Sequence, residues 1–288
     1  MRRAGLLGLV AAAVTPLLQA CSPLRIINAL APGSTYALTS GQAYGPNARQ
    51  KIDVYQPNPP VPDAPVVVFF YGGSWTTGER ADYLFAGEAL ASRGIVTLVA
   101  DYRLSPEVRY PVFLQDSALA VKWAADNAQR FGGDPRKLYV MGHSAGGYNA
   151  AMVALDPRWL GAVGMRPGQL AGFIGIAGAY DFLPIAIPEV QVAFNWPHTP
   201  PDSQPLWHAS PAAPRTLLLA ARNDTLVNPV RNTEGLSKKL RDAGVPVQTE
   251  ILDGVSHVTI IGSLAKPLRL LAPVLDRVAE FVKANTAA

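Results

Sequence analysis

A single serine stands between two glycines at residues 142–146, in the order Gly-His-Ser-Ala-Gly. The apolar run before this motif, residues 138–141, predicts a buried strand, and the residues from Ala145 onward predict a helix. A sharp strand-to-helix turn strains the central residue and crowds the positions two residues away, so both positions must be very small. The pattern therefore predicts that Ser144 is a nucleophile whose hydroxyl projects above a sheet. The alternative is a glycine-rich helix start with a capping serine.

A serine nucleophile needs a base within hydrogen-bond reach and an acid that orients the base. His257 follows the apolar run 247–252, and Asp224 follows the run 216–220. Each therefore lies just past the carboxyl end of a predicted strand, and the chain order Ser, Asp, His is one that such hydrolases use. We predict a catalytic triad of Ser144, Asp224 and His257. The alternatives for the acid are Asp181 and Asp253.

A glycine pair, a serine and a tryptophan follow the apolar run 66–71. Because an oxyanion hole needs donors from a second loop, we expect N–H groups of Gly73 and Ser74 to act with the N–H of Ala145. The start of the helix that follows Ser144 adds a favourable dipole for negative charge. Trp75 is expected to line the substrate pocket. Alternatively, the glycines form an ordinary turn and the tryptophan belongs to the core.

The segment 182–214 contains eight prolines, so one regular helix cannot run through it. Long structured loops in compact domains are usually functional, and this one is predicted to be a small lid over the pocket. A long surface connection is the alternative. The tryptophans of this segment, Trp196 and Trp207, are expected to line the pocket with Trp75.

Apolar runs rich in β-branched residues recur along the chain, and helical patterns separate most of them. Most runs are continuous, which is typical of strands covered on both faces. The alternation predicts an α/β fold with a mostly parallel sheet flanked by helices, so reactive loops gather at the carboxyl ends of the strands. The predicted strands are 52–55, 66–71, 95–101, 138–141, 173–176, 216–220 and 247–252.

The composition of the 288-residue chain fits one catalytic domain, which we place at residues 44–285. The formal net charge is +4, and without Arg2 and Arg3 the remaining excess of two positive charges gives no reason to expect a nucleic-acid partner. The chain has one cysteine, which excludes an internal disulfide and a cysteine zinc cluster. The four histidines have no metal-ligand spacing, so no metal site is expected, and the oligomeric state is not predicted.

At the N-terminus, Arg2 and Arg3 precede an apolar stretch at 6–18, and the sequence Leu-Gln-Ala-Cys ends at Cys21. This arrangement resembles a bacterial lipoprotein signal. This stretch is shorter than the roughly 20 residues that a membrane-spanning helix needs. We therefore expect a signal peptide at 1–20, a lipid anchor on Cys21 and a tether at 21–43. The protein would then be exported and anchored at the periplasmic or cell-envelope face of a membrane; an ordinary secretory signal is the alternative.

Together, these motifs resemble the α/β-hydrolase fold, in particular the carboxylesterases near the hormone-sensitive-lipase-like esterases and the arylformamidases. The resemblance covers about Tyr44 to Lys283. It implies a serine carboxylesterase that cleaves a small-molecule ester through an acyl-enzyme and needs no cofactor. An arylformamidase and a catalytically inactive hydrolase-fold binding protein are the alternatives. Further motifs that carry the resemblance are Lys-Ile-Asp-Val-Tyr at 51–55, Asp-Tyr-Arg-Leu-Ser-Pro-Glu at 101–107, Phe-Gly-Gly-Asp-Pro at 131–135 and Ala-Ser-Pro at 209–211.

One residue departs from the pattern of many of these relatives. They begin the oxyanion loop with histidine, whereas this chain has Tyr71. In prolyl-oligopeptidase-like hydrolases, a tyrosine before the glycines donates its hydroxyl to the oxyanion. The resemblance thus raises the hypothesis that Tyr71 does the same; alternatively, the backbone donors of Gly73 and Ser74 suffice.

Overall fold

The computed structural model describes residues 23–284, which fold around one eight-stranded sheet. The strand order is β1-β2-β4-β3-β5-β6-β7-β8. In this order, the strands from β4 to β8, which include β3, are parallel to one another. Strand β2 is antiparallel to both of its neighbours. The predicted α/β fold is thereby confirmed. The strands are β1 (Tyr36–Ala43), β2 (Lys51–Pro57), β3 (Ala64–Phe70), β4 (Val96–Ala100), β5 (Gly133–His143), β6 (Gly172–Ile176), β7 (Thr216–Ala221) and β8 (Val247–Leu252).

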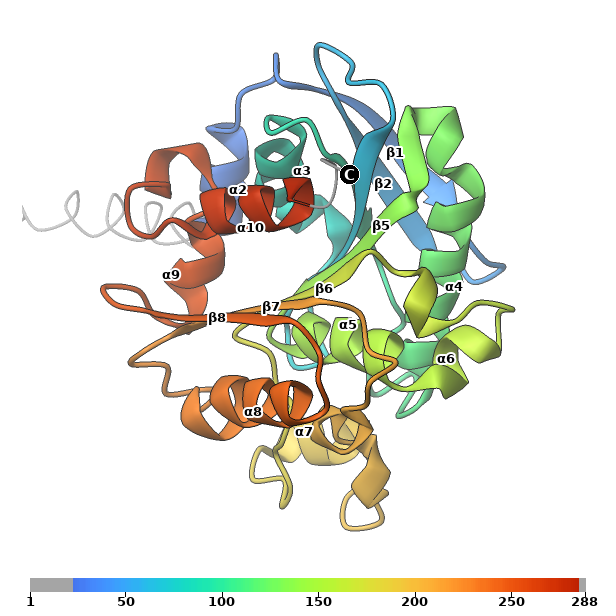
Figure 1. Ribbon diagram of the computed structural model, residues 1–288, viewed down its shortest axis with the longest axis vertical. Helices are drawn as coiled ribbons and strands as arrows, with labels where there is room; N and C mark the ends of the chain where they lie inside the picture. Colours follow the sequence, from blue (N-terminus) through green and yellow to red (C-terminus); the bar gives the residue numbers. More distant parts are fainter. Residues whose placement is uncertain (1–22, 285–288) are drawn as a thin grey trace, which may run out of the picture.

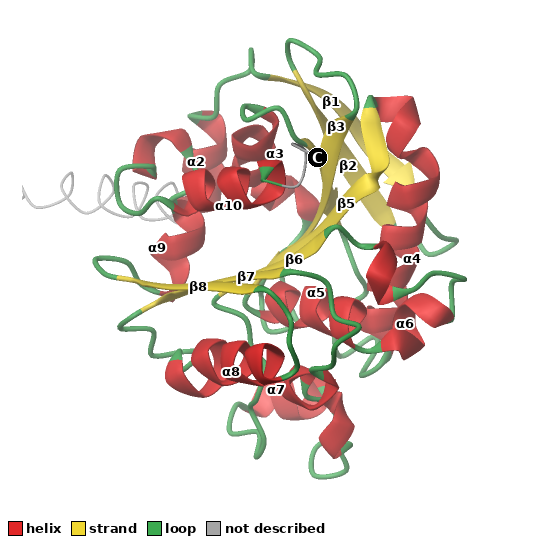
Figure 2. Cartoon of the chain, in the orientation of Figure 1, coloured by secondary structure: helices red, strands yellow, loops and turns green. Residues whose placement is uncertain are grey.

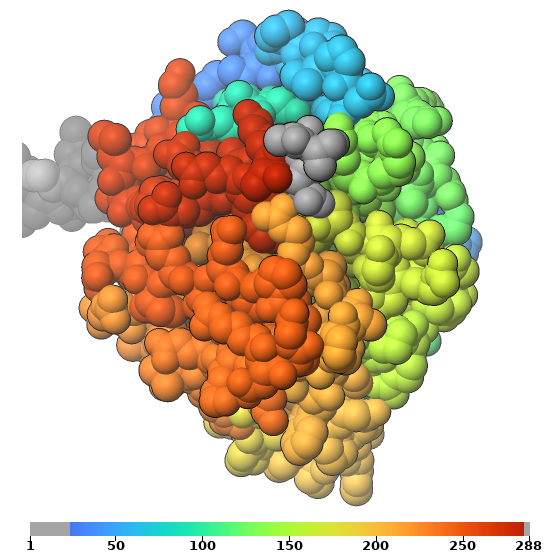
Figure 3. Space-filling view, viewed as in Figure 1, coloured from blue at the N-terminus to red at the C-terminus, as the bar shows by residue number. Residues whose placement is uncertain are grey.

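Helices cover both faces of the sheet (Figures 1 and 2). On one side lie α2 (Pro23–Ala29), α3 (Leu84–Ala91), α9 (His257–Gly262) and α10 (Val274–Lys283). On the other side lie α4 (Val112–Asn127), α5 (Ala145–Leu155), α6 (Pro157–Gly161), α7 (Pro188–Ala193) and α8 (Gly235–Asp242). This double cover explains why every residue of β3, β6 and β7 is buried and why their sequences are almost entirely apolar. Figure 3 shows that the late part of the chain, in orange and red, forms the left half of the visible surface.

Short turns of helix complete the connections, and glycines follow two helical segments where the sequence indicates. Gly132 comes after the 3₁₀ turn that continues α4 and takes a φ of 79°, and Gly244 comes after α8 and takes a φ of 80°, both in the left-handed region that favours glycine. At the start of the α8 region, the Asn228 side chain accepts a hydrogen bond from the N–H of Arg231 at 2.9 Å. The short turns are η1 (Arg80–Tyr83), η2 (Ala128–Phe131), η3 (Pro167–Gln169), η4 (Pro201–Ser203), η5 (Pro205–His208), the π-helical η6 (Val230–Glu234) and η7 (Lys266–Leu268).

The predicted tether at 21–43 is wrong over most of its length, because α2 and β1 belong to the fold. β1 pairs antiparallel with β2 from Tyr36 opposite Pro57 to Ala43 opposite Lys51. Its sequence has no continuous apolar run, because an edge strand of this sheet is only partly buried. Residues 1–22, which include Cys21, lie outside the described part of the chain. Within residues 23–284, no helix has the length and apolar character required to span a bilayer.

Candidate active site

A strained turn connects β5 to α5, and Ser144 occupies its centre. The serine has a φ of 54° and a ψ of −121°, a conformation that non-glycine residues rarely adopt. A Cβ atom on Gly142 would lie 2.0 Å from the carbonyl oxygen of Gly146, and one on Gly146 would lie 2.0 Å from the oxygen of Phe70. Only glycine therefore fits at either position. The motif folds as its spacing predicts, with the serine at the carboxyl end of a central strand.

Three side chains from distant parts of the chain form a continuous hydrogen-bonded series. The Oγ of Ser144 lies 2.9 Å from Nε2 of His257, and Nδ1 of His257 lies 2.6 Å from Oδ2 of Asp224. Because ionised Asp224 can only accept, Nδ1 carries the proton and Nε2 is left to accept from the serine hydroxyl. The structure thus brings together the three residues of the predicted triad in an order suited to general-base activation of the serine.

The loop after β7 holds Asp224 in place and keeps it ionised. Its Oδ1 accepts hydrogen bonds from the N–H groups of Leu226 at 2.9 Å and Val227 at 2.8 Å. Burial alone would raise the pKa of Asp224, but the hydrogen bonds from His257 and from these two N–H groups outweigh it and lower the pKa below its usual value. The carboxylate is therefore charged at neutral pH.

The two alternative acids are engaged elsewhere. Asp253 forms a surface ion pair with Arg222, with Nε and Oδ1 2.6 Å apart, and 73% of its side chain is exposed. Asp181 forms a bidentate pair with Arg231, at 2.9 and 3.0 Å. Neither carboxylate contacts the imidazole that Asp224 binds, so the geometry selects Asp224.

A second imidazole supports the site from inside the turn, and sequence reasoning gave it no role. Nε2 of His143 lies 2.9 Å from the main-chain oxygen of His257, and the two ring centroids are 4.8 Å apart. Burial, with a smaller contribution from His257, lowers the pKa of His143 to about 3. His143 is thus neutral at physiological pH, and its Nε2–H donates to that carbonyl. The one available sequence signal was its place beside Ser144.

The predicted oxyanion loop packs directly against the nucleophile. Gly73, Ser74 and Trp75 have φ values of 127°, 51° and 59°, so the loop folds through three successive positive-φ residues. Ser74 and Ala145 both line the cavity beside Ser144. As the first residue of α5, Ala145 has an N–H group without a partner inside the helix. Ser74 and Ala145 thus border the cavity next to the nucleophile, as the predicted oxyanion hole requires, while Gly73 does not line the cavity.

The hypothesis that Tyr71 donates its hydroxyl to an oxyanion is wrong. The hydroxyl donates to Oδ1 of Asp101 at 2.6 Å and accepts from Nη2 of Arg49 at 3.0 Å. The residue is fully buried and does not line the cavity. Burial, reinforced by the charge of Asp101, raises the pKa of Tyr71 far above its usual value. Asp101 also accepts from the N–H of Arg80 at 2.7 Å, so Tyr71 belongs to a network that fixes both ends of the oxyanion loop.

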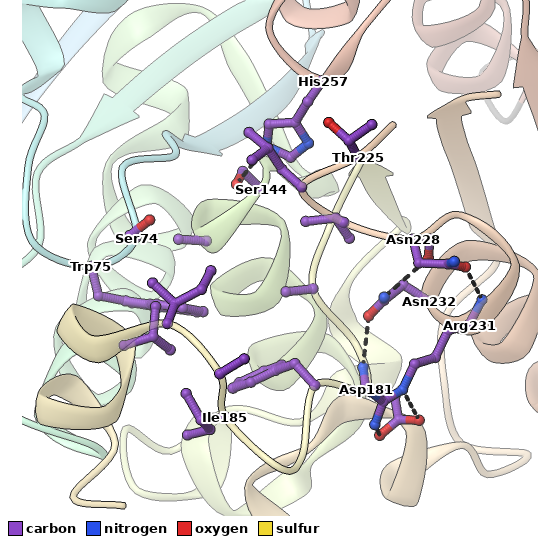
Figure 4. A pocket seen from close by; sticks show the side chains of 18 of the residues that line it. Ser74, Trp75, Ser144, Asp181, Ile185, Thr225, Asn228, Arg231, Asn232 and His257 are labelled. Carbon is purple, nitrogen blue, oxygen red and sulfur yellow. Dashed lines mark hydrogen bonds and ion pairs between the residues drawn. The ribbon is translucent and has the colours of Figure 1, made fainter. Parts of the chain in front are cut away.

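A cavity of about 530 Å³ opens beside Ser144 and has two different walls (Figure 4). One wall is apolar and comes from the oxyanion loop and the start of the proline-rich segment. Its members are Trp75, Phe182, Pro184, Ile185, Ala186, Ile187 and Val190. The other wall is largely polar and comes from Asp181, the loop after Asp224, and η6. Its polar members are Asp181, Thr225, Asn228, Arg231 and Asn232.

The predicted lid segment, 182–214, lines the cavity only with its first residues. Trp75 borders the cavity, and its Nε1 donates to Oδ1 of Asn149 at 3.0 Å. Trp196 and Trp207 do not border it, which corrects the prediction for both. After Val190 the chain packs along the helical layer instead, so Trp196 lies against the hydrophobic core and Trp207 is 69% exposed.

The fold and this site define an α/β-hydrolase, and residues 23–284 contain no cluster of histidine, cysteine, aspartate or glutamate suited to a metal ion. The structure resembles an esterase from Pyrobaculum calidifontis, with a TM-score of 0.74, 23% identity, and coverage of 92% of this chain and 89% of that one. It also resembles a truncated carbohydrate esterase from gut microbiota, with a TM-score of 0.73, 15% identity, and coverage of 89% of this chain and 99% of that one. At these low sequence identities, the two structural similarities support the assignment of the fold and nothing beyond it.

The chain belongs to the prolyl oligopeptidase family, whose model matches residues 112–286. A second family model, BD-FAE, matches residues 52–159. Esterase LipC of Mycobacterium tuberculosis is 31% identical over 217 residues, which are 69% of this chain and 54% of LipC. A probable isoprenylcysteine alpha-carbonyl methylesterase of Oryza sativa subsp. japonica is 26% identical over 249 residues, which are 78% of this chain and 59% of the rice protein. The chain therefore spans between half and three fifths of the length of these two relatives.

Proposed function

We propose that this protein is a serine carboxylesterase. The observation that carries the proposal is the hydrogen-bonded series from Ser144 through His257 to Asp224, at 2.9 and 2.6 Å, beside a cavity with one apolar and one polar wall. Nucleophile, base and orienting acid are already aligned for acyl transfer. The names of the two relatives described above, both esterases, favour an ester over other acyl substrates.

The reaction follows from this arrangement. The Oγ of Ser144 attacks the ester carbonyl carbon while its proton passes to Nε2 of His257, and the carbonyl oxygen becomes an oxyanion beside Gly73, Ser74 and Ala145. The C–O bond to the alcohol then breaks, and His257 returns the proton to the leaving oxygen. Water attacks the acyl-enzyme, His257 takes the water proton, and the carboxylic acid leaves as Ser144 regains its hydrogen.

Hydrolysis of 4-nitrophenyl butyrate by the purified protein tests the proposal. We expect turnover that Ser144→Ala abolishes, and we expect a fluorophosphonate to label the wild-type protein at Ser144 but not this variant. The matched control is Ser263→Ala, which removes the hydroxyl of a buried serine outside the cavity and should leave turnover and labelling in place. Ester turnover that persists in Ser144→Ala would refute the mechanism.

The same assay separates the alternatives. N-formylkynurenine turnover far above ester turnover would favour an arylformamidase, and folded protein without turnover or labelling would favour a binding protein. A proline 4-nitroanilide belongs in the panel because of the family name, and we expect it to be cleaved far more slowly than the ester. Preferred cleavage of the anilide would contradict the carboxylesterase assignment.

We also propose that the protein is exported and anchored through a lipid on Cys21. The support is the sequence alone: two arginines, an apolar stretch and the only cysteine of the chain at the expected junction. In producing bacteria fed labelled palmitate, we expect the wild type and Ser144→Ala to take up label and sediment with membranes. Cys21→Ser should do neither. Equal labelling of Cys21→Ser would refute the anchor.

A further inference from the structure

On the polar wall of the cavity, protein groups already donate to the side-chain oxygens of Asp181, Asn228 and Asn232. Both carboxylate oxygens of Asp181 accept from the guanidinium of Arg231 at 2.9 and 3.0 Å. Oδ1 of Asn232 accepts from the N–H groups of Tyr180 and Asp181 at 2.6 and 2.8 Å. Oδ1 of Asn228 accepts from the N–H of Arg231 at 2.9 Å. These acceptors are held by the fold, which also fixes the side chains that carry them.

Donors remain on the same wall. Within residues 23–284, Nη1 of Arg231 and Nδ2 of Asn228 make no hydrogen bond to protein, while both residues line the cavity. The ion pair with Asp181 and a hydrogen bond from Nη2 to the main-chain oxygen of Leu183 hold the guanidinium in one orientation. A wall whose carboxylate and amide oxygens already accept from protein groups, and which has free guanidinium and amide N–H groups, complements a ligand group that accepts hydrogen bonds.

The mechanism assigns this wall to one half of an ester. His257 must return its proton to the alcohol oxygen, so the alcohol portion lies on the His257 side of Ser144. The polar wall begins there, because Thr225 follows Asp224, the hydrogen-bond partner of His257. Figure 4 shows Thr225 near His257 and the Asp181–Arg231 pair farther from Ser144. The apolar wall begins at Trp75 of the oxyanion loop, where the acyl portion would lie.

We propose that Arg231 and Asn228 select esters whose alcohol portion carries an oxygen acceptor, a carbonyl or a carboxylate, several atoms from the scissile bond. Nη1 of Arg231 and Nδ2 of Asn228 donate to this acceptor, while the apolar wall receives the acyl chain. The inference rests on the proposed esterase function and defines its substrate class. Because Asp181 balances the charge of Arg231, hydrogen bonding contributes more to this selection than long-range attraction does.

Three phenyl butyrates with the same acyl group test the inference. They carry a carboxymethyl, an acetonyl or an isobutyl group at the meta position, so two have an oxygen acceptor and the third is an apolar counterpart of similar size. The measured quantity is the kcat/KM of each acceptor ester divided by that of the isobutyl ester. Comparing this ratio between wild type and variants removes the intrinsic reactivity of each leaving group.

Two variants remove the donors in different ways. The double variant Asp181→Asn/Arg231→Gln removes both members of the ion pair, so no unpaired charge remains. Asn228→Asp keeps the side-chain oxygen that accepts from the N–H of Arg231 but replaces the Nδ2 donor with a carboxylate oxygen. The matched control is Arg222→Gln/Asp253→Asn, which removes an exposed Arg–Asp pair that does not line the cavity.

We expect the ratio to fall about tenfold for the acetonyl and carboxymethyl esters in both variants, and to stay within about twofold of wild type in the control. Active-site titration with a fluorophosphonate normalises each preparation for folded protein. Equal ratios in wild type and both variants would overturn the inference while ester turnover itself continued. Absence of turnover with all three esters would instead refute the esterase proposal, and the inference with it.

Discussion

The buried imidazole of His143 should make the fold sensitive to mild acid. Burial lowers its pKa from an ordinary value of 6.5 to about 3, so the unfolded chain binds this proton more readily than the folded protein does. Because the pKa of His143 is lower in the folded state, its contribution to the free energy of unfolding is fully present above pH 6.5 and is lost as the pH falls toward 3. The slope within this window is about 1.4 kcal/mol per pH unit. Between about pH 7 and pH 5, the free energy of unfolding should therefore fall by roughly 2 kcal/mol from this residue alone.

Urea unfolding of the wild type and of His143→Gln from about pH 5 to pH 8 measures this contribution. Glutamine can still donate an amide N–H to the carbonyl of His257, but it does not titrate. Subtracting the two pH profiles cancels the titration of all other groups. We expect the wild type to lose about 2 kcal/mol more than the variant between pH 7 and pH 5. Parallel profiles would show that His143 titrates alike in both states, contrary to the burial argument.

Three further substitutions test the site. Asp224→Asn should lower kcat by roughly 10⁴-fold in the ester assay, because an amide N–H facing Nδ1 favours the wrong imidazole tautomer; a loss below tenfold would contradict this. Gly146→Ala should abolish activity and folding, since its Cβ would lie 2.0 Å from a strand oxygen, whereas Gly168→Ala, which meets nothing within 4 Å, should melt like wild type. Tyr71→Phe should lower the free energy of unfolding by about 1–3 kcal/mol and reduce kcat more than it changes KM; unchanged kcat and stability would show that its hydroxyl does not fix the oxyanion loop.

The fold was largely predictable because the strands of a sheet covered on both faces have continuous apolar runs in their sequences. All seven predicted strands are present, and β8 has the predicted bounds, 247–252. The pattern failed at β1, because an edge strand with partly exposed residues needs no apolar run. It also missed α7 inside the proline-rich segment, where Pro188 occupies the first turn, a position that needs no N–H donor.

The aromatic residues show where sequence reasoning stopped. Trp75 lines the cavity because it belongs to the oxyanion loop, whose position is set by β3. Trp196 and Trp207 were assigned to the pocket because of their segment, yet the chain turns away after Val190. No local rule distinguishes these tryptophans, since contact with the cavity depends on packing between distant elements.

By itself, the sequence determined the strand-to-helix turn around Ser144 and the places of Asp224 and His257 after their strands. These features depend on local geometry, on small residues and on the common direction of parallel strands. All three can be predicted from the spacing of residues along the chain. Only the tertiary structure decided that Tyr71 binds Asp101 and that His143 holds the carbonyl of His257. Such pairings join residues 30 and 114 positions apart. A hydroxyl or an imidazole can form hydrogen bonds with many kinds of group. Its actual partner therefore depends on which groups the folded chain brings near it.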